Sequence, residues 1–527
     1  MKRENFVFGG LAILAAILVV MMNVITAHHN DGMEGDEVFS YISATSMGGF
    51  KEVCFLDDQT WYPGEYFFNA LTAEGNERFN VKMVVENQAM DTHPPLFYLF
   101  LNLVCSVFEG QYSRLFGVGL NIFFMLFAGT GLFLLLEYYF HNKYASLAFS
   151  TIFCCSHLAI GMVLFIRMYV LLMALFLFQS WYHLKLYDRM KQSEEYLLKR
   201  HWQEYGVLGF LTIVGALTHY YFLVYQCLIA ALFIFGLWNH RKIKAILCYV
   251  GTMTVSGIVY VCLYPAVLEH MFFKYRGREA VHKFLKESSL FGDVIAMYKN
   301  FDEQLFKGSL LFIISIFAIL TILLLVRRKI KWQIIGKGCL LILPSLIYFY
   351  GVSKASPYVS IRYVSPVAAL IWAAVLVWGF YLIRNAIPQN RLRSSCILGV
   401  GGILAFLLTF YFMQTPVKAS YYSEKTELTQ ELAAEIPYCV YITGDEYNWK
   451  MWEDFVNYPA FEGLFFIDGK HKAVIEDAAL RRAEQLVIYV DKALDLDEMQ
   501  EYLQEYLPLQ QYEICYETSQ IYILLAR

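Results

Sequence analysis

The 527-residue chain has few charged residues: Asp, Glu, Lys and Arg make up only 17% of it, against 58% hydrophobic residues. Soluble domains carry about a quarter charged residues, so this composition excludes an ordinary soluble globule. The formal net charge is −4, and no basic tract interleaved with aromatics lies outside the apolar runs, which gives no support to nucleic-acid binding. We therefore expect an integral membrane protein.

Uncharged runs long enough to cross a bilayer recur along the chain. The stretch 144–184 contains a single charge, Arg167, and is about twice as long as one crossing requires, so we expect a turn near Arg167. The stretch 205–238 should turn near 218–220 for the same reason. This count predicts about eleven transmembrane helices, at 6–27, 115–136, 144–164, 168–184, 203–218, 220–238, 245–266, 308–326, 337–351, 363–383 and 396–413.

Loop charges orient the chain, because short cytoplasmic loops collect Lys and Arg. Lys2 and Arg3 precede the first run, which we interpret as a retained helix with a cytoplasmic N-terminus. Most loop cations then lie on the inner side, and the short outer turns hold only Arg167, Lys354 and Arg362. Two long outer loops follow, 28–113 and 267–307. The segment 94–108 is also apolar, but a further crossing there would put the basic loops that follow it on the outer side. We therefore predict that it forms a helix in or under the outer surface.

The tail differs from the rest of the chain. Buried strands are predicted at 438–443, 464–467 and 485–490, and a terminal hairpin at 512–516 and 520–524. Its predicted helices open with no glycine-rich phosphate loop, so nothing indicates nucleotide binding. The expected architecture is an α-helical polytopic membrane domain, 1–413, with a small extracytoplasmic α/β domain, 414–527. Eight cysteines lie in apolar helical runs, and a Cys439–Cys515 disulfide is one option for the tail.

Ionisable residues beside membrane spans are candidates for function. Asp36 and Glu37 begin the first outer loop, and the segment that starts with Asp91-Thr92-His93 closes it. The other outer turns add further polar side chains at the same membrane level: Arg167, His219, Tyr220, Lys354 and Arg362. Structural interpretations stand beside the functional one. An arginine can extend to lipid headgroups, and His219 with Tyr220 can belong to an interfacial aromatic belt.

At Asp36-Glu37 and His93-Pro94-Pro95-Leu96 the chain resembles the GT-C membrane glycosyltransferases. The resemblance is to the protein O-mannosyltransferase-like group (glycosyltransferase family 39), which includes the lipid A aminoarabinose transferase. It extends over about residues 1–413 in order and spacing. The supporting matches are Arg167-Met168-Tyr169, Thr218-His219-Tyr220-Tyr221, Ser356-Pro357-Tyr358 and Arg362-Tyr363.

The resemblance implies inverting transfer of a sugar from a polyprenyl-phosphate donor to a glycan, lipid or protein acceptor on the outer face. Asp36 would be the general base, and Glu37 would orient the acceptor, Asp36 or a cation. Arg167 and Arg362 would bind the departing phosphate, and His93 would line the acceptor side. The remaining expected substrate-binding residues are Tyr169, His219, Tyr220, Lys354 and Tyr363.

The sequence leaves alternatives for the cofactor and for the functional class of the protein. The protein mannosyltransferases of this group are thought to need no metal, whereas the related oligosaccharyltransferase subunit uses a divalent ion held by acidic motifs. Phe165-Ile166 occupy positions that are polar or acidic in many relatives, so we predict no metal ligands and leave a divalent cation open. A transporter or flippase for lipid-linked saccharides is the alternative function. Against it stand the lack of an inverted repeat and of charges near mid-membrane. A sensor or scaffold would leave the membrane-level charges unexplained.

Overall fold

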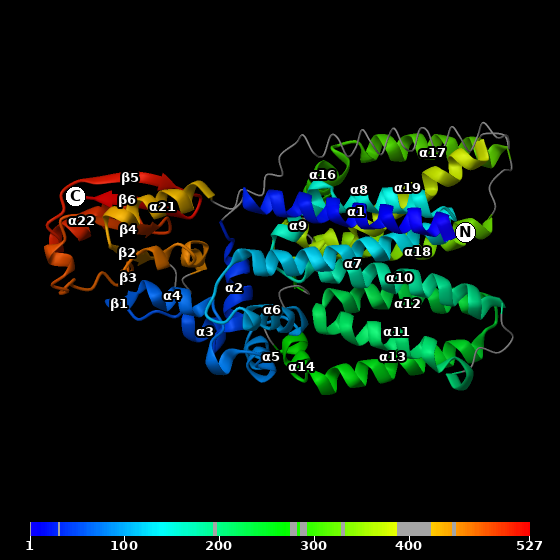
Figure 1. Cartoon of the computed structure of the whole chain (residues 1–527), viewed down its shortest axis with the longest axis horizontal. Coiled ribbons are helices and arrows are strands. Elements are labelled where there is room, and N and C mark those ends of the chain that lie inside the picture. The colour runs from blue at the N-terminus through cyan, green and yellow to red at the C-terminus, as the bar shows by residue number, and fades with distance from the viewer. Residues whose placement is uncertain are drawn as a thin grey trace.

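The computed structural model describes residues 2–29, 32–192, 198–273, 282–284, 292–327, 332–386, 423–444 and 449–527. A helical bundle and a six-stranded sheet lie at opposite ends of an elongated molecule (Figure 1). Short helices that follow the first long helix lie between them. This layered arrangement brings the first loop, the bundle end and the tail into contact.

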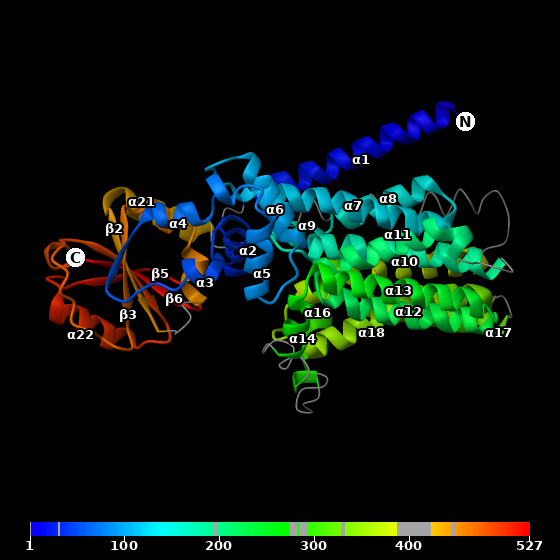
Figure 2. The same ribbon diagram turned by 90° about the horizontal axis from the view of Figure 1, so that it is seen from below.

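Long apolar helices build the bundle. They are α1 (Lys2–His28), α7 (Arg114–Phe140), α8 (Lys143–Cys154), α9 (His157–Leu164), α10 (Tyr169–Gln192), α11 (Leu198–Thr218), α12 (Tyr221–Asn239), α13 (Ile243–Leu263), α16 (Gly292–Phe306), α17 (Leu310–Val326), α18 (Trp332–Ala355) and α19 (Ala368–Ala386). The turns predicted near Arg167 and at 218–220 are confirmed, since α9 ends before Arg167 and α11 ends at Thr218. Figure 2 shows α1 leaning away from the other helices toward its N-terminus.

Six described helices are long and apolar enough to cross a membrane, or up to eight if each of two bent pairs is one span. The bent pairs are α8 with α9, at 56°, and α16 with α17, at 85°. These helices make the chain a multi-pass membrane protein, but the predicted count of eleven is not confirmed. The run predicted at 396–413 lies outside the described residues.

Helix α10 corresponds to the span predicted at 168–184, and it carries polar side chains that lower its mean hydropathy. Gln179 and His183 are buried in the bundle. Gln179 Nε2 donates to Gln226 Oε1 at 2.5 Å, and His183 Nε2 lies 2.9 Å from the hydroxyl of Tyr249. These polar side chains therefore find partners on α12 and α13 and need no contact with lipid.

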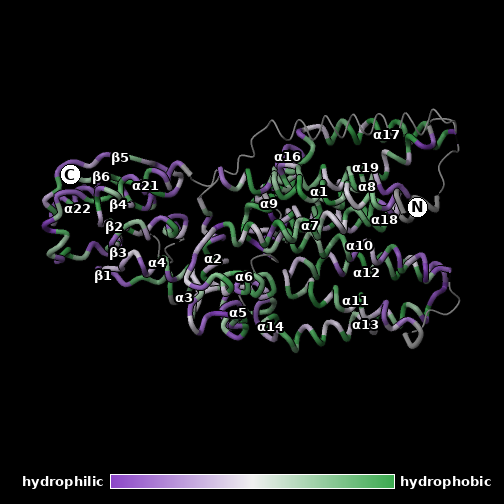
Figure 3. The backbone as a smooth tube through the Cα atoms, viewed as in Figure 1, coloured by the Kyte–Doolittle hydropathy of each residue, from purple (hydrophilic) through white to green (hydrophobic). Residues whose placement is uncertain are grey.

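Hydropathy differs between the two ends of the molecule. The helices of the bundle, α17 among them, are coloured mainly hydrophobic, whereas hydrophilic segments gather in the sheet and near α5 (Figure 3). Leu311, Phe312, Ile319 and Val326 of α17 are exposed. Apolar side chains on the outside of a bundle suit a lipid environment.

Short helices form the layer between bundle and sheet: α2 (Gly35–Thr45), α3 (Gly49–Val53), α4 (Gly64–Ala70), α5 (Val81–Met90), α6 (Leu96–Val107) and α14 (Ala266–Phe272). Helix α6 confirms that the apolar segment 94–108 is helical. Pro95 stands immediately before it, where a proline costs no helical hydrogen bond. Helix α2 packs against α6 and is buried along most of its length.

The sheet has the strand order β1-β3-β2-β4-β6-β5. Strand β2 (Tyr438–Thr443) pairs in parallel with β3 (Gly463–Asp468) and β4 (Leu486–Asp491), and the terminal hairpin is β5 (Tyr512–Glu517) with β6 (Ile521–Ala526). All five strands predicted in the tail are confirmed. We call this sheet, together with α21 (Ser423–Glu435) and α22 (Leu496–Tyr506), the sheet domain.

Two findings about the sheet were not foreseen. The first loop contributes the edge strand β1 (Thr60–Pro63), which pairs antiparallel with β3. The suggested disulfide is wrong, because Cys439 and Cys515 are both free. Cys439 lies on β2 and Cys515 on β5, and β4 and β6 separate these two strands. The sheet domain is thus joined to the first loop by strand pairing.

Candidate active site

Asp36 lies in the first turn of α2, at the bundle end that faces the sheet domain. Its Oδ1 accepts a hydrogen bond from Arg167 Nη2 at 2.9 Å, and its Oδ2 accepts one from Arg362 Nη1. The carboxylate is 27% exposed, whereas the two arginines are 6% and 13% exposed. One partly accessible carboxylate therefore holds two nearly buried guanidinium groups.

Arg167 is fixed by the turn between α9 and α10. Its Nη1 donates to the hydroxyl of Tyr98, on α6, at 2.8 Å, and lies 3.4 Å from Ser40 Oγ on α2. These partners pack the guanidinium between three elements. Charge-assisted hydrogen bonds of this kind are about twice as strong as neutral ones. The fork of Arg167 is thus held in place beside Asp36.

Arg362 lies in a short 3₁₀ turn, Ile361–Tyr363, after α18. Its guanidinium carbon is 5.4 Å from the ring centroid of Phe165 and 5.1 Å from that of Tyr363, and its Nη2 donates to the Tyr363 hydroxyl at 3.3 Å. Its Nε is buried and has no hydrogen-bond partner among the described residues. A buried donor without a partner is costly, so this N–H is free to bind an added anion.

The neighbouring charges determine the protonation state of Asp36. Burial favours the neutral acid, but the guanidinium groups of Arg167 and Arg362 outweigh it and hold the pKa of Asp36 below its usual value. Asp36 is therefore ionised at neutral pH. Its basicity is low while both arginines contact it.

Glu37 faces the interior of the protein. Its side chain is fully buried, Oε1 accepts from the Ile166 amide at 3.1 Å, and Oε2 accepts from the Glu34 amide at 2.9 Å. Arg114, on α7, approaches Oε1 to 3.5 Å. Glu37 thus connects α2 to the α9–α10 turn and to α7, and it places Asp36 relative to Arg167. The hydrogen bonds described here do not include one to Asp36.

His93 lies beside Asp91, a carboxylate that was predicted at the same membrane level but was given no role in the site. Its Nδ1 is 2.8 Å from Asp91 Oδ2. Burial opposes ionisation of Asp91, but His93 outweighs it and lowers the pKa of Asp91 to about 2. The charges of both His93 and Asp91 act on Asp36. The signal was in the sequence Asp91-Thr92-His93, whose two-residue spacing lets the side chains meet in a turn.

An aromatic cluster borders the two arginines. The ring centroid of Tyr169 is 5.6 Å from that of His219 and 6.2 Å from that of Tyr363, and the His93 and His219 centroids are 6.0 Å apart. Four residues predicted to bind substrate are therefore together: His93, Tyr169, His219 and Tyr363.

Two predicted site residues point elsewhere. The hydroxyl of Tyr220 is 2.5 Å from Nδ1 of His270, on α14. The Nζ atom of Lys354 lies over the ring of Phe284, 4.7 Å from its centroid. The described contacts of both residues thus belong to other elements of the outer loops, and the structure does not join them to Asp36.

Glu34 is a residue that the prediction missed. It precedes α2, its Oε1 lies 3.6 Å from Arg362 Nη1, and its side chain is 33% exposed. The spacing Glu34-x-x-Glu37 is typical of a capping pair at the start of a helix, and this signal was available in the sequence. Asp36 and Glu34 therefore share one guanidinium nitrogen.

The described residues contain no group of three or more His, Cys, Asp or Glu that could hold a metal ion. Both oxygens of Asp36 accept hydrogen bonds from arginine, and both oxygens of Glu37 accept from backbone amides. A divalent cation needs such oxygens as ligands, and two adjacent guanidinium groups repel it. The donor set therefore does not fit a resident metal.

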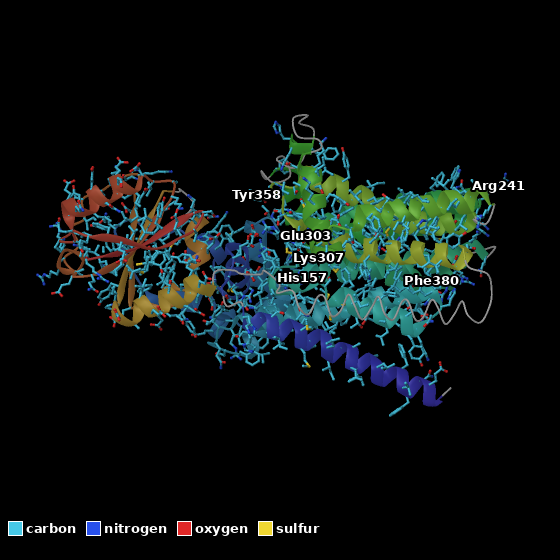
Figure 4. All side chains as sticks on the ribbon, turned by 90° about the horizontal axis from the view of Figure 1, so that it is seen from above. His157, Arg241, Glu303, Lys307, Tyr358 and Phe380 are labelled. Carbon is cyan, nitrogen blue, oxygen red and sulfur yellow. The ribbon has the colours of Figure 1, made fainter. Side chains whose placement is uncertain are left out.

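The ends of the bundle carry different side chains. Tyr358, from the Ser356-Pro357-Tyr358 motif, lies near the bundle end that faces the sheet domain, and Arg241, from a predicted inner loop, lies at the opposite end (Figure 4). The same view shows His157 and Lys307 close together, with Nδ1 and Nζ 3.1 Å apart. Tyr358 and Arg241, predicted on the outer and inner sides, thus lie at opposite ends of the bundle.

No family model matches the chain, and no curated protein matches its sequence. Solved structures do match. ArnT from Cupriavidus metallidurans, bound to undecaprenyl phosphate, aligns with a TM-score of 0.56 at 10% identity over 98% of each chain. The chain has the GT-C fold.

Archaeal structures extend this likeness. The GT-C oligosaccharyltransferase AglB from Archaeoglobus fulgidus, in complex with an inhibitory peptide and a dolichol-phosphate, aligns with a TM-score of 0.52 at 9% identity, over 98% of this chain and 74% of that one. A complex of the Archaeoglobus fulgidus oligosaccharyltransferase with Zn and sulfate gives 0.53 at 10% identity, over 97% and 72%. The expected GT-C architecture is confirmed.

Proposed function

We propose that the protein is a membrane glycosyltransferase that takes its sugar from a polyprenyl-phosphate donor. The observation that carries the proposal is the pair of nearly buried arginines on Asp36, of which Arg362 has an Nε with no hydrogen-bond partner among the described residues. The GT-C fold supports it, since ArnT and AglB were solved with undecaprenyl phosphate and a dolichol-phosphate.

The arginines suit the phosphate of the donor. Arg362 Nε offers a hydrogen-bond donor, and the planar fork of an arginine can bind two phosphate oxygens. The donor is a phosphodiester with one negative charge, whereas the released polyprenyl phosphate carries more. Two fixed cations therefore bind the departing group more tightly as its charge grows, which lowers the barrier to transfer.

Asp36 is the general base of this proposal. In the free protein both of its oxygens are bound by arginine, which keeps it a weak base. Donor phosphate shares the same guanidinium groups, which weakens their hydrogen bonds to Asp36 and makes one carboxylate oxygen more basic. That oxygen accepts the proton of the acceptor hydroxyl while the hydroxyl oxygen bonds to the anomeric carbon. The bond from that carbon to the phosphate oxygen breaks, and attack opposite the phosphate inverts the configuration.

The surrounding residues have supporting roles. Glu37 and Tyr98 position Asp36 and Arg167 through the hydrogen bonds described above. His93, Tyr169, His219 and Tyr363 border the donor and acceptor space, and aromatic faces of this kind pack against sugar rings. No step requires a metal, because the donor set does not fit one.

We propose that the reaction occurs on the outer face of the cell membrane and that the N-terminus is cytoplasmic. Arg241 and Lys242, in the loop between α12 and α13, and Lys244, in the first turn of α13, support this orientation. The sheet domain would then be extracytoplasmic and close to the acceptor, since Trp452, in the segment between β2 and β3, packs on Phe39 of α2 with ring centroids 3.6 Å apart. The acceptor is a glycan, a lipid or a protein hydroxyl.

The test is transfer by purified protein in vesicles. A panel of radiolabelled polyprenyl-phosphate hexoses is supplied together with envelope glycans, lipids and hydroxyl-bearing peptides, and labelled acceptors are identified by mass spectrometry. Labelled product from at least one donor supports the proposal. Movement of intact lipid-linked sugar across the vesicle membrane without any product would instead indicate a transporter or flippase.

A further inference from the structure

Two carboxylates, those of Glu34 and Asp36, lie near Nη1 of Arg362, and Asp36 is the closer of the two. Asp36 is hydrogen-bonded to it, whereas the Glu34 Oε1 atom is 3.6 Å away, beyond hydrogen-bond distance. Glu34 is also the more exposed of the two. Glu34 is therefore the anion that leaves Arg362 at the lower cost.

The charges around Glu34 are balanced before any donor binds. The groups that act on it are Asp36 and Glu37 on α2, the helix that Glu34 caps, Arg362 from the 3₁₀ turn, and Arg167 from the α9–α10 turn. Glu37 is balanced by Arg114. The remaining two arginines balance Asp36 and ionised Glu34. A donor phosphodiester adds one negative charge to a partly dry site, where an unbalanced charge is costly.

We propose that Glu34 couples donor binding to proton uptake: a proton from solvent neutralises Glu34, its contact with Arg362 is released, and the phosphodiester of the donor takes its place. This inference rests on the proposed function, since it concerns the same donor phosphate. It assigns Glu34 a positioning role, because it acts through Arg362. It also predicts that the donor binds more weakly as the pH rises.

The electrostatics of Glu34 agree with this role. Burial and the negative charge of Asp36 raise the pKa of Glu34 to about 7, despite the opposing effect of Arg362. Below that pH the group is protonated and the phosphate enters without added repulsion. Above it, the proton must be supplied on binding, which weakens the affinity by up to about tenfold per pH unit.

The experiment measures binding of one probe to full-length protein in nanodiscs. The probe is the methyl ester of undecaprenyl phosphate, a phosphodiester whose single charge does not change between pH 6 and 8. For the wild type the Kd is expected to rise roughly tenfold from pH 6 to pH 8, as one group with the pKa of Glu34 deprotonates. For Glu34→Gln the Kd at both pH 6 and pH 8 should lie within about twofold of the value that the wild type has at pH 6.

A matched control is Glu65→Gln, which neutralises an exposed glutamate of α4 in the same outer loop and should keep the wild-type slope. Thermal unfolding of Glu34→Gln checks that α2 still forms. The inference is overturned if the Kd of Glu34→Gln rises tenfold from pH 6 to pH 8, or if the Kd of the wild type does not change over this range. Either result leaves the proposed function standing. No binding by the wild type at any pH contradicts the proposed function, and the inference with it.

Discussion

Arg362 donates a hydrogen bond to Oδ2 of Asp36 although the two residues are 326 positions apart in the chain. Arg167 reaches the other oxygen of the same carboxylate from a distance of 131 positions. Two distant segments therefore converge on one side chain of a third. Such convergence of charged groups at the end of an apolar bundle is costly unless the groups are paired, and it is typical of a functional site.

Arg362→Lys should weaken use of the donor more than it weakens folding. A lysine ammonium cannot contact Asp36 and also present the flat, two-pronged donor set that binds a phosphate. We expect the KM for the polyprenyl-phosphate sugar to rise about 10- to 100-fold, the effect of losing a charge-assisted hydrogen bond.

Steady-state kinetics with varied donor measures this effect. Arg78→Lys is the matched control, because Arg78 pairs with Glu109 in the outer loop, and it should leave the KM unchanged. An Arg362→Lys enzyme with a wild-type KM would remove Arg362 from the donor site.

Glu37→Gln should lower stability more than it lowers the turnover of the folded enzyme. The substitution removes the charge that balances buried Arg114, and breaking a buried pair costs about 3–5 kcal/mol. We expect a lower midpoint of thermal unfolding in detergent. Unchanged thermal stability together with lost transfer would give Glu37 a direct part in the chemistry.

Tyr98→Phe and Tyr220→Phe should differ, although each removes one hydroxyl. The Tyr98 hydroxyl accepts from Arg167, so its loss should reduce kcat/KM about tenfold or more. The Tyr220 hydroxyl lies against His270, away from Asp36, and its loss should change kcat/KM less than about twofold. Initial rates of the two purified variants compare them directly. Equal losses would contradict the placement of Tyr220 outside the site.

Much of the site was predictable because bilayer thickness restricts where the chain can turn. Span lengths and loop charges placed Asp36, His93, Arg167 and Arg362 at one level of the membrane, and the structure brings these four together. The hydrophobic runs of the tail likewise identified its five strands. These signals are periodic or compositional, and a single sequence carries them.

Side-chain direction and local pairing could not be read in this way. Tyr220 and Lys354 lie at the predicted level, but the facing of a residue in a turn depends on its neighbours in space. Strand β1 is only four residues long, and it pairs with β3 about 400 positions away along the chain. The span of α10 was predicted, but the partners of its polar residues were not, because these partners lie on other helices.

The most direct test of the account is the release of free polyprenyl phosphate by purified protein supplied with a lipid-linked sugar and its acceptor. Wild type should release it, and Asp36→Asn should be slower by a factor of about 10² to 10⁴, the usual contribution of a general base. Asp57→Asn, in the outer loop, serves as the control and should match the wild type. Equal release by wild type and Asp36→Asn would contradict the central claim.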